Sequence, residues 1–411
     1  MGRLKMRPVL YLLLLNLIGF LLLFMYKEPK DINILYAGLA VLAINIGVYA
    51  LMRLLNMGDV YLFLMVSILV SIGIIMLIRL DTGFGYNQVF WFGAGVVVFL
   101  VSYLAFRLFK YWDKLLLLYI IVSFALFAIT LIFGVSRGGS RNWIAIGGKT
   151  VQPSEFIKIS YVFALACFFS AKKKKSGPMA GELLGIPKKF IAANIFVYMC
   201  LGFLLLQKEW GTAVVFFLTF YAMMFLYDAP KRLMLINALM LVVGLIGGYF
   251  LTDHIYSRVA TWMDPWADAT GKGYQITQSL FAITSGGYFG TGIGNGQPHF
   301  IPEVHSDFIF SAICEEMGVF TGIAIIMIYF IYSYRGFKIG LKAKSEFLKA
   351  LTFGLVLSFA FQTFIIVGGV IKLIPLTGIT MPFVSYGGSS MVSCCIMTGI
   401  LTAVSYLERK R

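Results

Sequence analysis

The stretch that decides the fold runs DVYLFLMVSILVSIGIIMLIR over residues 59–79, with charged side chains only at its two ends. A helix needs about 20 mainly apolar residues to cross a bilayer, and this run supplies them. Similar runs follow each other on both sides of it, so the sequence predicts an all-α, polytopic transmembrane protein with about twelve spans. The expected spans are residues 8–26, 33–54, 59–79, 86–106, 114–134, 153–171, 190–207, 210–228, 232–251, 305–333, 346–370 and 386–407.

The composition of the 411 residues supports this class of protein. Sixty per cent of the residues are apolar and 13% are charged, whereas a soluble domain carries roughly 25% charged residues. Mean hydropathy is +0.88. These values exclude a secreted, cytosolic or disordered protein, and the solid apolar runs argue against a membrane β-barrel, whose strands alternate. The first run has no small-residue cleavage site after it and is expected to stay as a membrane helix.

The basic residues indicate how the chain is oriented. The net charge of +16 would suggest nucleic acid in a soluble protein, but here the Lys and Arg residues lie between apolar runs. With the N-terminus inside, 23 of the 34 fall in inner segments, including Lys172 to Lys175, and ten fall outside. This excess predicts that both termini are cytoplasmic.

Two long outer loops are then expected, at about residues 135–152 and 252–304. The cluster His299, Glu303, His305 and Asp307 could bind a metal, but it lacks a zinc signature. The five cysteines lie in apolar segments without ligand spacing, so they indicate neither disulfides nor a zinc site. We therefore expect no resident metal.

The larger loop contains the segment Asp264-Pro265-Trp266-Ala267-Asp268. One interpretation is a solvated loop in which the aspartates only form turns. The tryptophans beside the aspartates, Trp262 and Trp266, favour a second interpretation. An aromatic wall next to a carboxylate suits a site that binds a sugar or lies at the membrane interface. The composition alone leaves both interpretations open.

Charge and broken backbone also occur within the expected spans. Glu155 and Lys158 are three residues apart and can pair on one helix face, either as a structural ion pair or as part of a site. Glu315 and Glu316 lie in an apolar run, where carboxylates are expensive and usually functional. Two prolines and three glycines interrupt residues 375–390, and such backbone is tolerated at membrane depth only where it is buried or lines a cavity.

Together these segments resemble the SEDS family (shape, elongation, division and sporulation) of the RodA, FtsW and SpoVE type. The motifs that carry the resemblance are Arg141-Asn142-Trp143, Gln152-Pro-Ser-Glu155-Phe-Ile-Lys158, Gly211-Thr212, Gly273-Tyr-Gln-Ile-Thr-Gln278-Ser279, His305-Ser-Asp307-Phe-Ile-Phe310, Glu315-Glu316-Met-Gly318, Pro375-Leu-Thr-Gly378 and Pro382-Phe-Val-Ser-Tyr-Gly-Gly-Ser-Ser390.

The resemblance implies a division of the chain. The family has a ten-helix core, which would occupy residues 57–411, with the large outer loop at about 252–304. Residues 1–56 would then be two accessory N-terminal helices. The chain departs locally from the family: it reads Lys208-Glu209-Trp210 where Pro-Asp-Leu is usual, and it has Ile366 and Lys372 where Asn and Gly are common.

The resemblance also implies a function. Such a protein is a peptidoglycan glycosyltransferase that polymerises lipid II, with inversion, on the outer face of the bacterial cytoplasmic membrane. It serves cell elongation, division or sporulation. The alternative is a lipid II flippase, since charged groups inside the membrane suit a transporter too.

Several site roles follow from the resemblance. Asp268, in a Pro-x-x-Asp context, matches the catalytic aspartate and would act as general base. A divalent cation such as Mg²⁺ or Mn²⁺ could stabilise the leaving group, and the expected partner is a class B penicillin-binding protein. The residues expected to contact the substrate are Arg141, Trp143, Gln152, Glu155, Lys158, Arg258, Tyr274, Gln275, Gln278, Ser279, His305, Asp307, Glu316, Thr377, Ser385, Tyr386 and Ser389.

Overall fold

The computed structural model describes residues 7–27, 30–137, 140–171, 182–183 and 186–409. The expected cytoplasmic run Lys172 to Lys175 lies outside these residues. Within them, eleven helices are long and apolar enough to cross a membrane, and the chain is an all-α multi-pass membrane protein.

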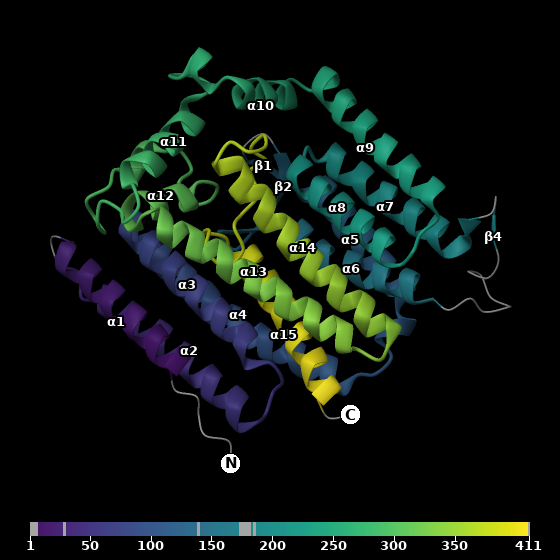
Figure 1. Ribbon diagram of the computed structural model, residues 1–411, viewed down its shortest axis with the longest axis horizontal. Coiled ribbons are helices and arrows are strands. Elements are labelled where there is room, and N and C mark those ends of the chain that lie inside the picture. The colour runs from purple at the N-terminus through teal and green to yellow at the C-terminus, as the bar shows by residue number, and fades with distance from the viewer. Residues whose placement is uncertain (1–6, 28–29, 138–139, 172–181, 184–185, 410–411) are drawn as a thin grey trace.

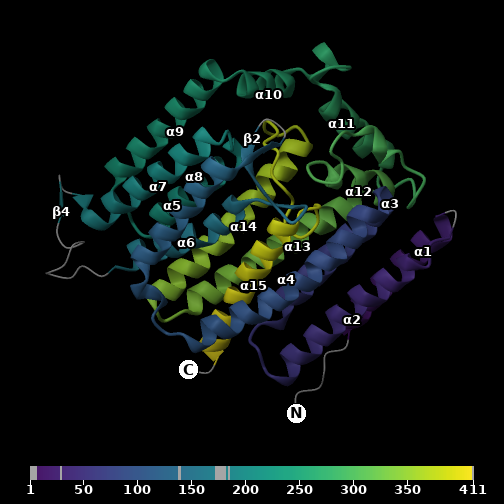
Figure 2. The same cartoon turned by 180° about the vertical axis from the view of Figure 1, so that it is seen from behind.

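The long helices lie side by side in one bundle, with α1 and α2 at one edge and α7 and α9 at the other (Figures 1 and 2). They are α1 (Arg7–Tyr26), α2 (Asn33–Leu54), α3 (Val60–Leu80), α4 (Thr82–Leu108), α5 (Leu116–Phe133), α6 (Pro153–Ser170), α7 (Lys188–Leu206), α8 (Trp210–Leu226), α9 (Lys231–Leu251), α13 (Val319–Lys342), α14 (Glu346–Val370) and α15 (Gly388–Arg409). Ten of the twelve expected spans coincide with span-length helices, the span expected at 305–333 only overlaps α13, and α8 is shorter than a span.

One end of the bundle carries most of the remaining structure. A three-stranded hairpin sheet, β1 to β3, fills the first expected loop, and α10, η2 and α11 form an arch across the top of Figure 1. The remaining elements are η1 (Trp112–Lys114), β1 (Val135–Arg137), β2 (Ser140–Ile146), β3 (Lys149–Val151), β4 (Glu182–Leu183), β5 (Ile186–Pro187), α10 (Asp253–Met263), η2 (Pro265–Asp268), α11 (Tyr274–Gly286), η3 (Pro298–Phe300) and α12 (Ile309–Met317).

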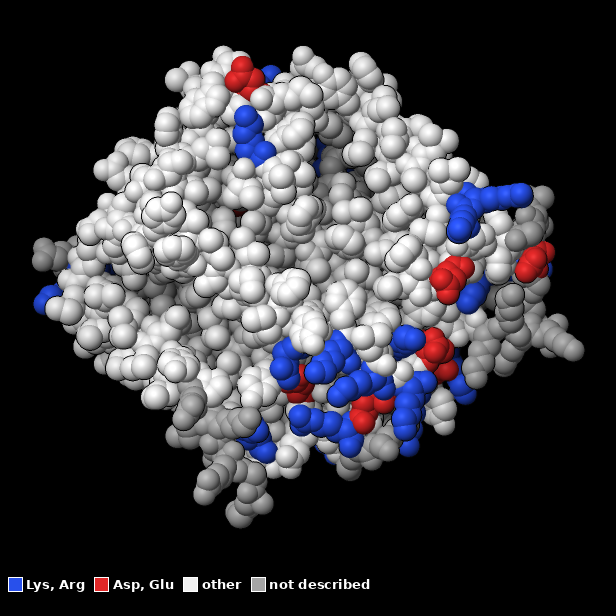
Figure 3. Space-filling view, viewed as in Figure 1, with Lys and Arg blue, Asp and Glu red and all other residues white. Residues whose placement is uncertain are grey.

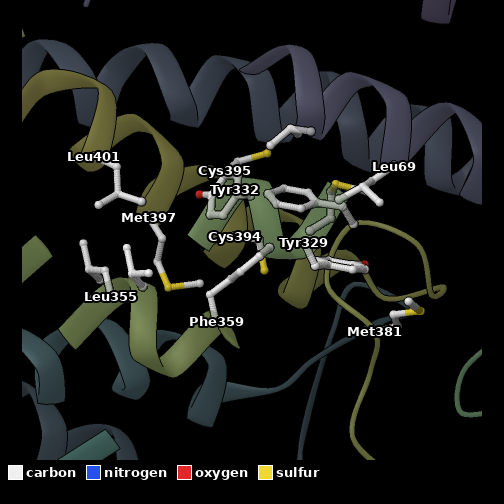
Figure 4. Packing of buried hydrophobic residues seen from close by; sticks show 14 of the residues in the cluster. Leu69, Tyr329, Tyr332, Leu355, Phe359, Met381, Cys394, Cys395, Met397 and Leu401 are labelled. Atoms are coloured by element: carbon white, nitrogen blue, oxygen red, sulfur yellow. The ribbon is translucent and has the colours of Figure 1, made fainter. Parts of the chain in front are cut away.

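The core lies between α3, α6, α14 and α15, in which 83–89% of the residues of the spanning stretch are buried. Figure 4 shows how this interior is filled: Tyr332 from α13 and Phe359 from α14 pack with Cys394, Cys395 and Met397 of α15. In contrast, only 17% of the residues in the spanning stretch of α9 are buried. Apolar side chains that point away from the bundle suit contact with lipid tails, which are as apolar as leucine.

The expectation of one helix over residues 305–333 is wrong. Gly318 has φ +84° and separates α12 from α13. A Cβ at this position would come within 2.3 Å of the Tyr288 carbonyl oxygen. Glycine therefore permits both the left-handed backbone and the close approach, and the break turns α12 back toward the arch.

The two N-terminal helices pack against α3 and α4. The Tyr86 hydroxyl donates a 2.6 Å hydrogen bond to Asp31 between α1 and α2. At the end of α1, the Tyr26 ring lies 5.1 Å from the Arg79 guanidinium. The same ring covers Gly294, where a Cβ would come within 2.4 Å of it. The helix pair thus touches both the bundle and the loop between α11 and η3.

Candidate active-site cavity

A cavity of about 860 Å³ opens at the end of the bundle that carries the hairpin and the arch. Its walls come from α4, the β2–β3 hairpin, the start of α6, the start of α8, α10 and the interrupted segment before α15. The lining combines acidic, basic, neutral polar and aromatic side chains with an apolar side formed by α8, α9 and α10. A concave site with a few convergent polar groups is the usual form of a substrate site.

One buried polar feature of the cavity is the pair formed by Glu155 and Lys158 on α6. The sequence prediction of this pair is confirmed, because Lys158 Nζ lies 2.8 Å from Glu155 Oε2 and both residues are buried. Lys158 also donates to Gln362 Oε1 at 2.6 Å, and Ser393 Oγ donates to Glu155 Oε2 at 2.6 Å. Buried charges are tolerated when they are paired and hydrogen-bonded in this way, and the network ties α6 to α14 and α15.

A second buried carboxylate, Glu209, lies in the turn between α7 and α8. Its Oε1 accepts three hydrogen bonds: from Gln152 Nε2 at 2.8 Å, Ser154 Oγ at 2.6 Å and Thr212 Oγ1 at 2.6 Å. Burial nevertheless raises the pKa of Glu209, since the three bonds offset the loss of hydration only in part. Glu209 holds the start of α6 against the start of α8.

Arg258 and Asp307 flank the backbone of Gly378. Gly378 has φ +69°, and a Cβ on it would lie 3.2 Å from Arg258 Nη2 and 3.3 Å from Asp307 Oδ2, so a larger residue would strain the backbone and displace both charged groups slightly. Arg258 Nη1 donates to the Leu376 carbonyl oxygen at 2.8 Å. Burial raises the pKa of Asp307 to about 6, although Arg258 acts in the opposite direction. The carboxyl group of Asp307 therefore titrates close to neutral pH.

Aromatic rings form the wall nearest α4. His305 stacks on Phe84 with centroids 4.2 Å apart and planes 14° apart, and Tyr386 packs against both rings. Farther along α4, Lys149 Nζ from the hairpin lies 4.9 Å from the centroid of Trp91. Rings with polar edges suit a ligand that has both apolar faces and hydroxyl groups.

About half of the residues expected to contact substrate lie together in this cavity. They are Trp143, Gln152, Glu155, Lys158, Arg258, His305, Asp307, Thr377 and Tyr386. They come from five separate parts of the chain, between residues 143 and 386. The fold thus brings together groups that are far apart in sequence.

Other residues from the same prediction lie outside the described lining of the cavity. Arg141 is exposed on β2 and donates from Nε to the Gly134 carbonyl oxygen at 2.8 Å. Ser385 is buried and donates to the Ser306 carbonyl oxygen, and Ser389 is buried in the first turn of α15. The hydrogen bonds of Arg141 and Ser385 thus stabilise the backbone to which they bind.

The residues on α11 and α12 also lie away from the described cavity wall. Tyr274, Gln275 and Gln278 are partly buried on α11, and Ser279 Oγ is 2.7 Å from Ser311 Oγ inside the protein. Glu316 is buried and lies 3.0 Å from Arg79 Nε. The ion pair anchors α12 to α3 and explains why carboxylates occur in this apolar segment.

Asp268 lies at the corner of the arch, in η2 between α10 and α11. Its side chain is exposed, and Asp268 is not among the described residues that line the cavity. Its Oδ2 accepts a 2.9 Å hydrogen bond from the Lys272 backbone N–H. Nearby, Asp264 Oδ1 caps η2 by accepting from the Trp266 N–H at 3.0 Å, so the two aspartates have different environments.

Several important residues were not found by sequence reasoning. Gln362 and Ser393 bind the Glu155–Lys158 pair, and Arg79 pairs with Glu316. Neutral polar residues inside apolar helices give no signal of their own, so only packing could show their partners. Glu209 did carry a signal, as a carboxylate directly before an apolar helix, but its three hydrogen bonds could not be read from the sequence.

Comparison with characterised proteins shows relatives of this chain. The peptidoglycan glycosyltransferase RodA of Mycobacterium tuberculosis is 36% identical over 278 residues, which cover 67% of this chain and 59% of that protein. The matched part of this chain thus spans less than two thirds of the mycobacterial protein. Stage V sporulation protein E of Bacillus subtilis is 32% identical over 367 residues, covering 85% of this chain and 98% of that protein.

Solved structures share the fold. A chain from a peptidoglycan synthase complex superposes with a TM-score of 0.69 at 22% identity, covering 86% of this chain and 99% of the other. Rod shape determining protein RodA of Thermus thermophilus gives a TM-score of 0.61 at 22% identity, with 86% and 97% covered. The helical fold of this chain is therefore shared with solved proteins.

A family model described as cell cycle protein, FTSW_RODA_SPOVE, matches residues 59–410. This range begins at the N-cap of α3 and ends just beyond α15, so it contains every cavity-lining residue described above. Together with the relatives, this match establishes that the chain belongs to the FtsW, RodA and SpoVE family of cell cycle proteins.

Proposed function

We propose that this protein is a peptidoglycan glycosyltransferase that polymerises lipid II into glycan strands at the outer face of the cytoplasmic membrane. The relatives named as peptidoglycan glycosyltransferases support this activity. The observation that carries it is the cavity, which joins an apolar side to a charged and polar interior. A lipid-linked sugar diphosphate has the same three parts: an apolar tail, an anionic diphosphate and a polar saccharide.

The tail and the diphosphate suit the side of the cavity formed by α8, α9 and α10. Val215, Leu245 and Ile255 are the apolar lining residues that these three helices supply, and Lys208 and Arg258 line the same cavity. When the donor's bond between C1 and the diphosphate oxygen breaks, negative charge grows on the lipid diphosphate. Fixed cations directed at this oxygen stabilise the transition state more than the ground state.

Asp268 is the proposed general base. It would accept the proton of the acceptor sugar's C4 hydroxyl as the oxygen of that hydroxyl attacks C1 of the donor. Because Asp268 is exposed at the arch and outside the described cavity wall, this role requires the acceptor to meet the donor at the outer mouth of the cavity. A positioned base typically supplies about 10²- to 10⁴-fold in rate.

The proposed chemistry is assigned to side chains alone. Among the described residues, no three His, Cys, Asp or Glu side chains converge in a way that would hold a metal ion. Lys208 and Arg258 line the cavity with positive charge, whereas Lys158 is paired with Glu155. A divalent cation that arrives with the diphosphate would act as part of the substrate.

A lipid II flippase remains the second candidate. The observation that favours it is the buried Glu155–Lys158 pair, since ionisable groups inside spanning helices often mark a transport path. A flippase would move lipid II without lengthening glycans, so one assay separates the two functions.

Orientation and partner belong to the same proposal. Basic side chains, with several acidic ones among them, gather at the end of the molecule opposite the arch, near the end of α15 (Figure 3). The positive-inside rule places this end in the cytoplasm and the cavity outside. The fold is shared with a chain of a peptidoglycan synthase complex, and this similarity supports a class B penicillin-binding protein as the partner.

The test is polymerisation of labelled lipid II by the purified protein, with and without such a partner, followed by separation of products by length. We expect glycan strands longer than one disaccharide unit. Transfer of lipid II across vesicle membranes without any lengthening would support the flippase and contradict the polymerase.

A further inference from the structure

A second hollow of about 500 Å³ lies between α7 and α9, and we call it the α7–α9 groove. Five of its lining residues come from α7 and one from the first turn of α9. They are Ile191, Asn194, Ile195, Tyr198, Met199 and Leu233. None of the six is among the described residues that line the substrate cavity, so the groove is a separate surface.

The groove is apolar, because its two polar side chains bind within the protein. Asn194 Nδ2 donates to the Phe190 carbonyl oxygen at 2.7 Å, one turn earlier on the same helix. The Tyr198 hydroxyl donates to Asn237 Oδ1 of α9 at 2.8 Å. The other four lining residues are Ile, Met or Leu, and Ile195 is 58% exposed. In a bundle surrounded by lipid, such a surface fits an acyl chain.

The entrance of the groove lies at the end of the bundle opposite the arch. α9 leads into α10 of the arch, and α7 leads into the turn that holds Glu209 beside the cavity, so both helices begin at the other end (Figures 1 and 2). Ile191 and Leu233 lie in the first turns of α7 and α9. The groove therefore opens toward the leaflet opposite the mouth of the cavity.

Basic side chains accompany this entrance. Lys188 lies about one helical turn before Ile191, and Lys231 and Arg232 directly precede Leu233. All three basic side chains are exposed. The salt bridges between described residues include none of the three. These cations are therefore available to an anion at the entrance.

The acids in the same segments do not cancel this charge. Before the two helices and in their first residues, positions 182–189 and 228–232 hold four Lys or Arg against two acids. Even with Lys189 set aside, because it donates to carbonyl oxygens at the end of α6, three cations remain for two acids. A positive entrance attracts a phosphodiester and repels the ammonium of a zwitterionic headgroup, so it favours an anionic lipid.

We propose that the α7–α9 groove binds one anionic phospholipid, whose acyl chain lies along the apolar lining and whose phosphate is held by Lys188, Lys231 and Arg232. This site is independent of the polymerase activity. A bound lipid would cover α9, in which only 17% of the residues of the spanning stretch are buried. It would thereby hold against α7 the helix that supplies Leu245 to the substrate cavity.

The test titrates the full-length protein in detergent with dioleoyl phosphatidylglycerol or dioleoyl phosphatidylcholine, and native mass spectrometry measures the bound lipid. We expect the wild type to prefer phosphatidylglycerol, and Lys188→Gln with Arg232→Gln to weaken that binding about fivefold or more. Binding of phosphatidylcholine should stay unchanged. The matched control is Lys338→Gln with Lys342→Gln, which removes two exposed cations from the end of α13.

A second variant tests the groove itself. Ile195→Trp places a larger side chain in the space for the acyl chain and should weaken binding of phosphatidylglycerol. Its matched control is Ile323→Trp, since Ile323 is similarly exposed on α13 and should tolerate the change without loss of lipid.

Each outcome decides the proposal. Wild-type affinity of the Lys188→Gln and Arg232→Gln double variant for phosphatidylglycerol would overturn it, as would an equal loss in the α13 charge control. Equal loss of both lipids would show that the entrance does not select charge, and unchanged binding by Ile195→Trp would exclude the groove. If the double variant does not fold, Lys231→Gln alone is subject to the same criteria.

Discussion

Removal of a proton from a sugar hydroxyl requires a carboxylate that the substrate can reach, and Asp268 is exposed at the corner of the arch. We predict that Asp268→Asn, which keeps size and polarity but removes basicity, inserts normally and loses at least about 10²-fold in polymerisation rate. Product length and rate with labelled lipid II are the measurement. Full activity of this variant would contradict the role of Asp268.

Asp264→Asn is the matched control for this experiment. Asp264 caps η2 through the Trp266 N–H, and an asparagine oxygen can keep that hydrogen bond. We expect only a mild effect. If Asp264→Asn were inactive and Asp268→Asn active, the base would have to be assigned to the other end of η2.

The Glu155–Lys158 pair leads to a second prediction at this scale. Removing one partner of a buried ion pair typically costs about 3–5 kcal/mol, so Glu155→Ala should sharply lower folded yield or activity. The exchange of Glu155→Lys with Lys158→Glu should restore part of the loss, because Ser393 and Gln362 can each either donate or accept. Thermal unfolding and polymerisation are the measurements. Neutral single variants, with no gain from the exchange, would refute an energetically important pair.

Asp307 gives a pH-dependent prediction. Burial raises its pKa from 3.8 to about 6, and Arg258 and Glu303 are the charged groups that act on it. Because the folded state prefers the protonated acid, wild-type stability is lost as the pH rises from about 4 through about 6. Relative to the wild type, Asp307→Asn should therefore gain thermal stability over this interval and keep a constant advantage above it. A stability difference that does not change with pH would show that Asp307 is not buried as an acid.

At the scale of elements, the pair α1 and α2 is expected to be accessory. The family model begins at residue 59, and the cavity contains no residue from either helix. We predict that a chain starting at Met57 keeps some polymerase activity but unfolds at a lower temperature, because Tyr26 no longer covers Arg79 and Gly294. Thermal unfolding and polymerisation of the truncated protein test this.

The truncation has a clear opposing result. A truncated protein that is folded and inserted but fails to polymerise would assign α1 and α2 to the active machinery. The substitution Tyr26→Ala in the full chain is the matched control, since it removes the contact with Arg79 and Gly294 while both helices remain. It should lower the unfolding temperature and leave polymerisation nearly unchanged.

At the scale of the whole molecule, the charge distribution predicts topology. We expect both termini and the segment around residue 174 to be cytoplasmic, on the basis of the excess of Lys and Arg in the inner segments. A cysteine introduced by Lys174→Cys should resist a membrane-impermeant thiol reagent in intact cells and react after lysis. Labelling in intact cells would reverse the topology and place the cavity on the inner face.

Much of the molecule follows from the sequence alone. The spanning helices are set by apolar run length, because a backbone in lipid must satisfy its own hydrogen bonds and only a helix does so within one segment. The Glu155–Lys158 pair follows in the same way, because residues three apart share a helix face. These features depend on neighbours in the chain, so local pattern is sufficient to predict them.

The arrangement of the site depended on tertiary structure. The contact of Gly318 with Tyr288, the bonds from Gln152 and Ser154 to Glu209, the contacts of Gln362 and Ser393 and the approach of Arg258 to Gly378 all join segments that are distant in sequence. An apolar run specifies that a helix forms but not which helices touch, since lipid is as apolar as a leucine-rich partner. Sequence therefore determined the class, the spans and many candidate side chains, whereas packing decided which of them share the cavity and which, like Glu316 with Arg79, hold its walls.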